Sequence, residues 1–279
     1  MTEKKLTILL VTGAFMLAAC GPSEPEAPAA ADPAPAAAAP EPAPAPEPAA
    51  AMTETDLSTR LAVESRPAED RARDAGRKPA EVLAYLGVEP GMNVIDLIAA
   101  GGWYTEVLSL AVGPEGSVTA QNPGWMRAFR DGAIVAGIDD RIGARLPNVT
   151  RLDNEWSELA AMEPDQFDVA LSALNIHDVY YMQSPEETAE FAAAVYHVLK
   201  PGGVFGVIEH VGNPDGDNEA LHRLDRQVAI DILTGAGFEL EGDSDLLANP
   251  NDDHTESVFA EGLRGNTDRF LLKFRKPAD

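Results

Sequence analysis

One stretch of the sequence decides the fold class: residues 93–106 read NVIDLIAAGGWYTE, an apolar run, then a glycine pair, then a second apolar pattern. Residues 93–97 have the length and composition of a buried strand, and residues 103–112 have those of a helix. Glycines at such a junction let the backbone approach a ligand and present helix-terminal N–H groups to an anion. The stretch therefore predicts a strand, a turn and a helix, in which the turn is either a ligand-binding loop or only a tight connection.

The same alternation of strand and helix continues along the chain. Further strands are predicted at residues 117–120, 148–152, 167–171, 204–208, 237–240 and 270–274, and helices at 125–135, 185–199 and 219–236. Strands that alternate with helices predict a parallel sheet covered on both faces. No long helix separates the last two strands, so the final strand is expected to insert antiparallel at an edge. We therefore predict an α/β domain with a doubly wound, mostly parallel seven-stranded sheet whose last strand is antiparallel.

Two further segments belong to the folded part. Residues 55–86 carry apolar residues at helical spacing, and Pro67 and Pro79 are expected to divide them into shorter helices. Residues 241–268 form a polar connection that is too long for an idle loop, and we expect a lid or part of a site there.

The N-terminus has the pattern of an export signal. Two lysines precede an apolar run at residues 6–17, which is too short to span a bilayer but is typical of a signal peptide. The run ends in LAAC, which predicts a signal peptide at residues 1–19 and lipidation of Cys20; the alternative is an uncleaved anchor helix with a chance cysteine. Gly21, not Asp, follows Cys20, as in lipoproteins of the outer membrane. We therefore expect a lipid-anchored protein of the cell envelope, at the outer membrane facing the periplasm.

Composition divides the rest of the chain in two. Residues 20–52 begin with Cys20 and consist almost wholly of Ala, Pro and Glu, which cannot form a core and predict a disordered tether. Residues 53–279 are predicted to form the folded domain. The chain has 46 acidic and 21 basic residues, a formal net charge of −25, which repels polyanions and argues against nucleic acid as a partner. Cys20 is the only cysteine, so no disulfide framework and no thiolate metal cluster are expected.

Two motifs give the folded part a family resemblance. The stretch at 94–106 resembles the first motif of class I S-adenosylmethionine-dependent methyltransferases, and its GGWYTE end is similar to that of a bacterial group of predicted methyltransferases, joined here to a lipoprotein signal. Residues 199–204, LKPGGV, resemble the turn that enters the fifth strand in the same superfamily. The resemblance covers the whole domain and implies a Rossmann-like fold, S-adenosylmethionine as the cofactor and a small-molecule methyl acceptor.

The resemblance also implies which residues meet the cofactor. These follow the first four predicted strands: Asp96, Ala100, Gly101, Gly102, Asn122, Asp153 and Asn175. By resemblance, Asp153 faces the adenine amino group, and Asn122 stands where an acidic residue usually accepts from the ribose hydroxyls. An Asn oxygen accepts without charge, and such bonds are about half as strong as charge-assisted ones. Three spaced glycines are usual in the first motif, but Ile98 and Ala100 occupy the first two places, which predicts weak or altered cofactor binding.

Polar and aromatic side chains gather at the ends of the later strands. His177 and Asp178 follow the fourth strand, and His210 ends the fifth. In a methyltransferase the acceptor meets the methyl group at this edge, so we predict these three residues to be catalytic, with His177 as the base for a hydroxyl or amine acceptor. The predicted substrate pocket comprises Tyr104, Tyr181 and His222. The alternative is that each histidine is a surface or packing residue.

The same cluster offers ligands for a metal ion. His177, Asp178, Glu209 and His210 supply nitrogen and oxygen atoms, but their spacing matches no known metal motif. We therefore predict no metal ion.

The sequence thus predicts S-adenosylmethionine-dependent methyl transfer to a small acceptor in the cell envelope, with the membrane contacted through the lipid anchor. One rival is a non-catalytic envelope binding protein that retains the methyltransferase fold. Another is a structural envelope protein with an empty cleft. No feature of the sequence indicates an oligomeric state.

Overall fold

The structure, a computed structural model, describes residues 52–143 and 145–278. The predicted signal peptide at 1–19, the lipidation site Cys20 and all but the last residue of the predicted tether at 20–52 lie outside the described residues. The predicted domain at 53–279 is described except for residues 144 and 279. None of the helices in the described ranges combines the length and the hydrophobicity needed to cross a bilayer.

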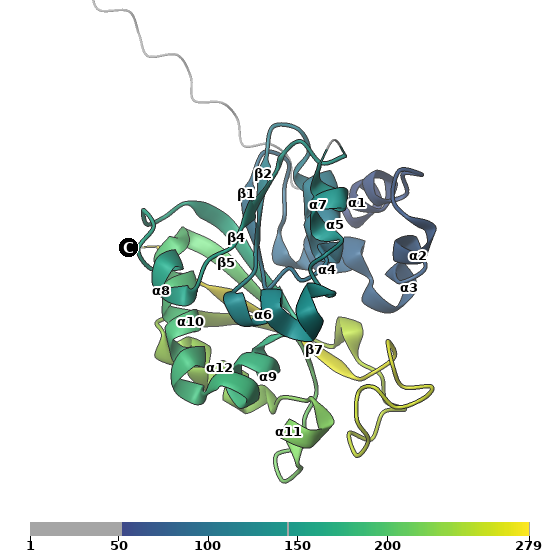
Figure 1. The fold of residues 1–279 in the computed structure, drawn as a ribbon, viewed down its shortest axis with the longest axis vertical. Helices are drawn as coiled ribbons and strands as arrows, with labels where there is room; N and C mark the ends of the chain where they lie inside the picture. Colours follow the sequence, from purple (N-terminus) through teal and green to yellow (C-terminus); the bar gives the residue numbers. More distant parts are fainter. Residues whose placement is uncertain (1–51, 144, 279) are drawn as a thin grey trace, which may run out of the picture. The chain divides into compact units, whose positions relative to one another are not determined.

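A seven-stranded sheet forms the centre of the domain (Figure 1), in the order β3-β2-β1-β4-β5-β7-β6. Its strands are β1 (Asn93–Leu97), β2 (Ser117–Gln121), β3 (Val149–Leu152), β4 (Phe167–Ala173), β5 (Leu199–His210), β6 (Glu239–Ser244) and β7 (Arg269–Arg275). Strands β1 to β5 pair in parallel, whereas β7 pairs antiparallel with both β5 and β6. The predicted sheet, with its antiparallel last strand, is therefore confirmed.

The predicted place of the last strand, at an edge of the sheet, is wrong. Strand β7 enters between β5 and β6 and leaves β6 as the edge strand. The side chains of β7 are nearly all buried, from Phe270 to Phe274, whereas those of β6 are exposed or half-buried. An apolar strand gains more from an interior position, so the polar strand takes the edge.

The helices follow the predicted alternation but differ in length. Their bounds are α1 (Glu54–Leu61), α2 (Ala68–Arg71), α3 (Asp74–Arg77), α4 (Pro79–Leu86), α5 (Trp103–Val112), α6 (Gly124–Ala128), α7 (Ile138–Ile142), α8 (Trp156–Leu159), α9 (Ile176–Asp178), α10 (Pro185–Val198), α11 (Asn218–Leu221) and α12 (Arg226–Gly235), with short turns η1 (Phe129–Gly132), η2 (Val179–Gln183) and η3 (Asp245–Leu247). Pro67 precedes α2 and Pro79 begins α4, so both prolines divide the N-terminal helical segment as predicted.

Alternate residues of the strands point to the two faces of the sheet. In β1, Val94 belongs to one apolar cluster and Ile95 to the other, and in β5 Val204 and Phe205 divide in the same way. Helices α1, α4 and α5 pack on the first face, and α8, α10 and α12 pack on the second (Figure 1). Both faces are thus covered, which leaves the edges of the sheet for ligands.

The helix predicted at 125–135 is shorter than expected. Helix α6 stops at Ala128, and Arg130 and Asp131 have positive φ angles of 50° and 56°. Gly132, which also has a positive φ, continues the turn. The chain then leads Ile134 and the following residues over the glycine-containing loop after β1, so packing on that loop overrides the helical pattern.

The helix predicted at 219–236 is split in two. His222, with a φ of 54°, ends α11 in the left-handed conformation, and the side chain of Arg223 turns into the interior. Asp225 then caps α12 by accepting from two backbone N–H groups. The break places His222 beside the end of β4, which an unbroken helix would not do.

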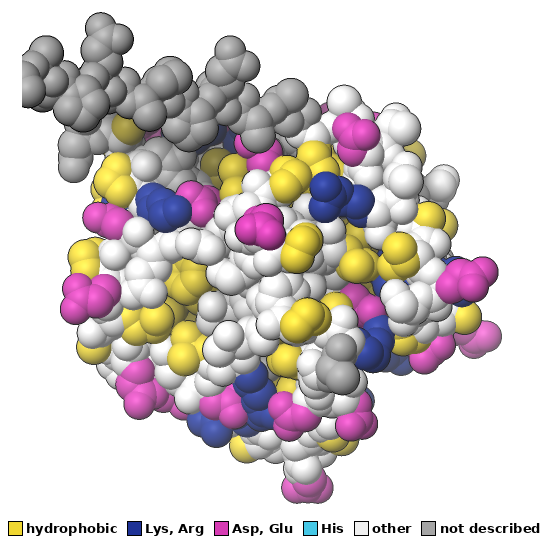
Figure 2. Space-filling view, turned by 90° about the horizontal axis from the view of Figure 1, so that it is seen from above, with side chains coloured by type: hydrophobic (Ala, Val, Ile, Leu, Met, Phe, Trp, Pro, Cys, Tyr) yellow, Lys and Arg dark blue, Asp and Glu magenta, His cyan; other side chains and the backbone are white. Residues whose placement is uncertain are grey.

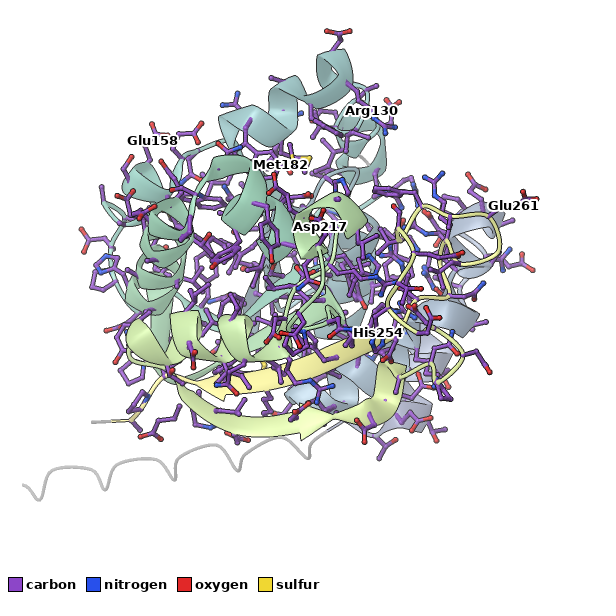
Figure 3. All side chains as sticks on the ribbon, turned by 90° about the horizontal axis from the view of Figure 1, so that it is seen from below. Arg130, Glu158, Met182, Asp217, His254 and Glu261 are labelled. Carbon is purple, nitrogen blue, oxygen red and sulfur yellow. The ribbon has the colours of Figure 1, made fainter. Side chains whose placement is uncertain are left out.

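The carboxyl ends of the parallel strands lie at one edge of the sheet, and the strand order reverses there between β1 and β4. Several loops cover this edge. In the view from below (Figure 3), Asp217 before α11 lies between Met182 of η2 and His254 of the connection between β6 and β7. The candidate site is built from this edge and these loops.

Candidate functional site

The loop after β1 keeps a glycine-type backbone at positions that lack glycine. Ile98, Ala100 and Gly102, the three places where the first motif usually has glycines, have φ angles of 53°, 52° and 79°. Left-handed backbone costs a residue with a Cβ about 1–2 kcal/mol. The loop therefore holds two strained residues, which persist only because surrounding contacts fix them.

Four polar side chains supply those contacts. Gln121 Oε1 accepts from the N–H of Ile98 at 3.2 Å, and Asn122 Oδ1 accepts from the N–H of Ala100 at 2.8 Å. Asn175 Nδ2 donates to the carbonyl of Ile98 at 3.3 Å. Arg141 Nε donates to the carbonyl of Gly101 at 3.0 Å. The loop is thus held from β2, from the end of β4 and from α7.

The residues predicted to meet the ribose and the adenine point elsewhere. Asn122 is fully buried, and its carboxamide is bound to Ala100 through both the N–H and, at 3.4 Å, the carbonyl group. Asp153 forms an ion pair with Arg151 at the surface. Neither Asn122 nor Asp153 lines the cavity beside the glycine loop. In this structure Asn122 serves as a brace of the loop.

Asp96, by contrast, lies at the loop as predicted. Its carboxylate accepts from the Thr105 hydroxyl at 2.6 Å and is 3% exposed. Burial raises the pKa of Asp96 to about 7, although the hydrogen bonds from Thr105 oppose the shift. Burial likewise raises the pKa of the neighbouring Tyr104 to about 12. Near neutral pH the site therefore holds a carboxyl group that gains or loses a proton readily and a neutral phenol.

A cavity of about 290 Å³ lies against this loop. Its lining includes the predicted residues Asp96, Ala100, Gly101, Tyr104 and Asn175, together with Arg73, Arg77, Arg141 and Leu174. The N-terminal segment thus supplies one wall and the glycine loop the other.

The second half of the site centres on His177. Its Nδ1 lies 2.7 Å from Glu209 Oε2, and Glu209 Oε1 accepts from the N–H of Ile176 at 2.5 Å. On the other side of the ring, His177 Nε2 lies 3.4 Å from Asp178 Oδ1. Burial opposes the charged ring, but Glu209 and Asp178 outweigh burial and raise the pKa of His177. Both ring nitrogens thus face carboxylates.

The other two predicted histidines lie close by. His222 Nδ1 is 3.4 Å from the same Asp178 oxygen, and the His222 ring packs edge-on against Phe259. His210 Nδ1 lies 2.7 Å from the Thr267 hydroxyl. Burial, with His177 and then Arg269 as the nearest charges, lowers the pKa of His210 well below its usual value. His210 is therefore a neutral imidazole at neutral pH, and the pKa values of His177 and His210 are shifted in opposite directions.

A second cavity, of about 850 Å³, adjoins the first and shares Arg73, Arg77 and Leu174 with it. His177, Asp178 and His210 line it, so the three predicted catalytic residues meet in one space. Neither Tyr181 nor His222 is in its lining, and Tyr104 lines the smaller cavity instead. The two cavities together place the glycine loop and the histidines on either side of one opening.

The larger cavity gathers positive charge. Arg73, Arg77, Arg264 and Arg269 line it, against the single carboxylate of Asp178. Arg269 donates to the carbonyls of Gly76 and Thr267, and Arg77 stacks on Trp103 at 4.5 Å from the ring centre. Burial, and next the charge of Arg73, lowers the pKa of Arg77 to about 10. On the face seen in Figure 2, by comparison, charges of both signs are mixed among hydrophobic side chains.

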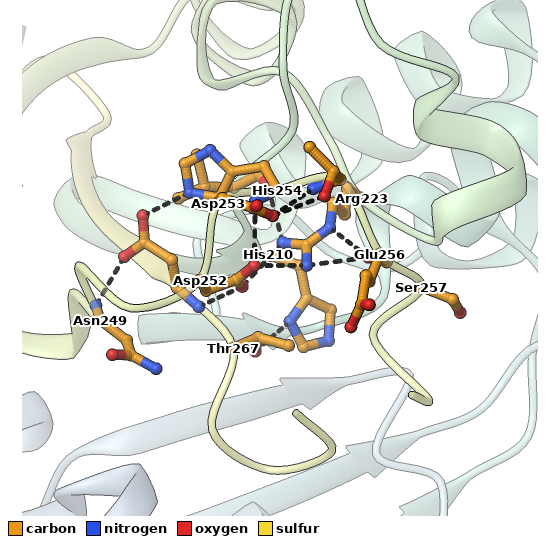
Figure 4. A network of polar contacts seen from close by, with 12 residues as sticks. His210, Arg223, Asn249, Asp252, Asp253, His254, Glu256, Ser257 and Thr267 are labelled. Atoms are coloured by element: carbon orange, nitrogen blue, oxygen red, sulfur yellow. Dashed lines mark hydrogen bonds and ion pairs between the residues drawn. The ribbon is translucent and has the colours of Figure 1, made fainter. Parts of the chain in front are cut away.

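The connection predicted to be a lid or part of a site forms one wall of the larger cavity, through residues 258, 259 and 264–267. Its first part is pinned by a buried ion pair (Figure 4): Arg223 Nη2 and Nη1 lie 2.8 and 3.0 Å from the two oxygens of Asp252. Arg223 also donates to the carbonyls of Val211 and Glu256. Asp268 closes the loop by accepting from Asn249 and pairing with His254. The wall is thus fixed at its base.

The fold is shared with known enzymes. A structure of an S-adenosylmethionine-dependent methyltransferase from Aquifex aeolicus is similar, with a TM-score of 0.54 and 18% identity, over 81% of this chain and 99% of that one. The protein has the class I methyltransferase fold. No family model matches the sequence.

Two curated methyltransferases are similar in sequence over part of their length. A sterol 24-C-methyltransferase of Yarrowia lipolytica is 24% identical over 197 residues, which are 63% of this chain and 47% of that protein. An uncharacterized methyltransferase of Synechocystis is 26% identical over 133 residues, which are 46% of this chain and 51% of that protein. The chain spans about half the length of the curated relatives it matches.

The arginines and the role of Glu209 were not predicted from the sequence. Arg73 and Arg77 come from the N-terminal helical segment, whereas Arg264 and Arg269 lie near the other end of the chain. The stretch RARDAGR at 71–77, a basic cluster in an acidic chain, was a signal for Arg73 and Arg77 alone. Glu209 was considered only as a metal ligand, although its place before His210 at the end of a strand put it at the same edge.

Proposed function

We propose that the domain binds S-adenosylmethionine in the smaller cavity and transfers its methyl group to a small molecule in the larger one. The observation that carries this proposal is the junction of the two cavities at Arg73, Arg77 and Leu174. Methyl transfer is an in-line displacement, which needs donor and acceptor held in contact and water excluded. Adjoining cavities, one at the glycine loop and one at the histidines, supply that arrangement.

The residues present fit the amino-acid end of the cofactor. Asp96 offers a carboxylate to its ammonium group, and the guanidinium groups of Arg73 and Arg77 offer donors to its carboxylate. The side chain of Asn122 is not available to bind the ribose, because both its oxygen and its nitrogen are bonded to the backbone of Ala100. When bound, the cofactor supplies a methyl group on a positively charged sulfur. We therefore assign binding to Asp96, the arginines and the loop, with little contribution from Asn122.

Our proposal gives the role of base to His210. Both nitrogens of His177 face carboxylates, so neither is turned towards an acceptor in the cavity. His210 is neutral, has Thr267 on Nδ1 and lines the larger cavity, so its other nitrogen is able to take a proton from the acceptor. His177 then acts as a positioning residue between Glu209 and Asp178.

The charges of the larger cavity favour an anionic acceptor. Of the four arginines, Arg77 is half-buried and stacks on Trp103, whereas Arg269 is buried and donates to backbone carbonyls. A carboxylate or phosphate in the cavity would balance these charges. Acceptors tested as pairs of free acid and amide should react only as the free acid, and equal reaction of both would contradict this assignment.

Titration calorimetry of the full chain tests cofactor binding. Wild type should bind S-adenosylmethionine and S-adenosylhomocysteine, and Asp96→Asn should weaken binding of the former about tenfold through loss of one charge-assisted contact. Asp168→Asn is the matched control, since Asp168 pairs with Lys200 at the opposite end of β4. Absence of binding by wild type would overturn the proposal.

The second candidate is a binding protein that retains the fold without turnover. The observation in its favour is the buried Asn122, together with Arg141, which bonds to Gly101 and lies over the loop. Binding of a small anion to a protein that does not bind S-adenosylmethionine would support this candidate.

We also propose that the domain works in the cell envelope, anchored through Cys20. The support is the sequence of residues 1–20. In a Gram-negative host, the wild-type chain should fractionate with membranes and carry acyl mass, and Cys20→Ala should lose both. A wholly soluble, unmodified wild type would contradict the anchor.

A further inference from the structure

The three predicted site residues His177, Asp178 and His222 form a cluster, and the proposed reaction gives no role to His222. His177 Nε2 and His222 Nδ1 each lie 3.4 Å from Asp178 Oδ1. One ligand atom from each of the three residues lies within 4.8 Å of the others. We infer that this cluster is a binding site for a divalent transition-metal ion, Zn²⁺ or an ion of similar preference.

The separations fit coordination better than hydrogen bonding. An N–H···O bond has a usual length of about 2.7–3.2 Å, shorter than both 3.4 Å separations. A tetrahedral ion with bonds of about 2.0–2.1 Å holds neighbouring ligand atoms about 3.3–3.4 Å apart. Two imidazole nitrogens and one carboxylate oxygen are ligands that Zn²⁺ takes in proteins. Two of the three edges thus already have the length that a bound ion requires.

Glu209 prepares His177 for this role. Its Oε2 lies 2.7 Å from His177 Nδ1, and its Oε1 is fixed by the N–H of Ile176. A proton on Nδ1 leaves the lone pair of Nε2 free, directed to the side of Asp178. Metal-bound histidines almost always donate their second nitrogen to such a carboxylate. Glu209 is fully buried, so these contacts hold its carboxylate in place against the His177 ring.

The backbone of His222 adopts a strained conformation that brings its side chain to the cluster. His222 is a non-glycine residue with a φ of 54°, held by the bond from the N–H of Arg223 to the carbonyl of Asn218. Phe259 supports its ring, with centroids 4.9 Å apart. Strained left-handed residues of this kind tend to occur where a site over-determines them. The strain is explained if His222 has to reach Asp178.

Within the cluster itself the charge differs from that of the arginine-lined wall. When a metal ion takes the place of a proton on His177 Nε2, Asp178 and Glu209 give the cluster a formal charge of −2, which one divalent ion balances. Three protein ligands leave one position of a tetrahedral ion for another ligand. His177 and Asp178 line the larger cavity, so that position opens to the space assigned to the acceptor. Binding of an acceptor oxygen there rests on the proposed function; the metal site itself does not.

No metal ion was expected from the sequence, because the ligands match no spaced motif. Residues 177 and 178 are adjacent, and the third ligand comes 44 positions later through a broken helix. Only the fold reveals that His222, and neither Glu209 nor His210, completes the set.

Zinc titration of the tag-free full chain carrying Cys20→Ser tests the site, since this substitution removes the only thiol. One Zn²⁺ should bind per chain, and Co²⁺ should give the visible absorption of a tetrahedral site. His222→Ala and Asp178→Asn should each weaken binding at least 100-fold, and Glu209→Gln should weaken it 10- to 100-fold. His254→Ala is the matched control and should leave binding unchanged, because His254 pairs with Asp268 outside the cluster.

Circular dichroism of each metal-free variant separates lost ligands from lost folding. His222 is half-exposed, so His222→Ala should keep the fold and decides the test even if Glu209→Gln does not fold. No binding by the Cys20→Ser chain, or binding that His222→Ala and Asp178→Asn leave unchanged, would overturn the inference. Because S-adenosylmethionine is titrated separately, failure here would not count against methyl transfer.

Discussion

The two halves of the site, the glycine loop after β1 and the cavity lined by the histidines, differ in how tightly they are packed and in how much charge they carry. At the glycine loop the backbone is left-handed at Ile98 and Ala100, which are not glycines, and Asn122 and Arg141 hold the loop from either side. At the histidines the chain leaves a larger cavity lined by charged and titratable groups. The comparison teaches that residues other than glycine can adopt a left-handed backbone, provided that hydrogen bonds from neighbouring side chains hold it. The motif that resembles methyltransferases lies in the glycine-loop half, whereas the residues of the histidine half match no motif.

The histidine half depends most on the pinned connection, so breaking its anchor should have the largest effect. Arg223→Ala leaves Asp252 as a buried charge without its partner and should lower the free energy of unfolding by about 3–5 kcal/mol. Urea unfolding measures this change. Arg226→Ala removes a half-exposed pair with Asp243 and should cost at most about 1 kcal/mol. Equal losses in the two variants would mean that the anchor has no special role.

The glycine-loop half should show the strongest pH dependence, through Asp96. Its folded pKa of about 7 exceeds the ordinary value of 3.8, so between these values the folded state binds the proton more tightly than the unfolded state. Its effect on stability is therefore neutral below about pH 4, becomes unfavourable as the pH rises towards 7, and then stays constant. The whole shift corresponds to at most about 4 kcal/mol.

Asp96→Asn tests this dependence. The amide keeps an acceptor for Thr105 without the charge, so the variant should gain stability over wild type as the pH rises from 5 to 8. Urea unfolding at several pH values measures the difference. Parallel curves for the two proteins would show that Asp96 does not titrate in this range.

The substitution Asn122→Asp tests whether Asn122 holds the glycine loop or contacts the ribose of the cofactor. As a brace, Asn122→Asp places a buried carboxylate beside the carbonyl of Ala100 and should lower stability at pH 8 by about 1–3 kcal/mol. The loss should shrink at pH 5, where a protonated carboxyl group can donate again. As a ribose contact, the same change should instead tighten binding of S-adenosylmethionine, which calorimetry would detect.

The smallest expected effect concerns the strained loop. Ala100→Gly should raise stability by up to about 1 kcal/mol, because glycine adopts a positive φ without strain. Its neighbour gives the control: Ala99 is not among the residues with positive φ, so Ala99→Gly should lower stability by about 0.5–1 kcal/mol. Thermal unfolding of both variants checks the sign. A loss of stability in both variants would show that the backbone of the loop is not strained at Ala100.

The sheet could be predicted because its inner strands each carry an apolar run, which the edge strand β6 lacks, and the glycine loop because a single motif contains it. Helix 125–135 could not, since its apolar spacing did not reveal that residues 134–141 pack on the loop. The arginine cavity could not either: Arg269 meets Gly76 across 193 positions of sequence. The predicted catalytic histidines do meet in space, but the opposite shifts of their pKa values could not be predicted, because these depend on burial and on Glu209 and Arg269, which only the fold brings to them.

The insertion of β7 between β5 and β6 has a consequence for how the chain folds. β6 precedes β7 in the chain, yet β6 has no partner in the sheet until β7 has paired with β5. A folding chain therefore carries an open strand edge on β5, at Phe205 and Val207, until β7 pairs with it. Such an edge is a template for pairing with another chain. Completion of the sheet is thus a non-sequential event, and the folding domain is most exposed to aggregation before it.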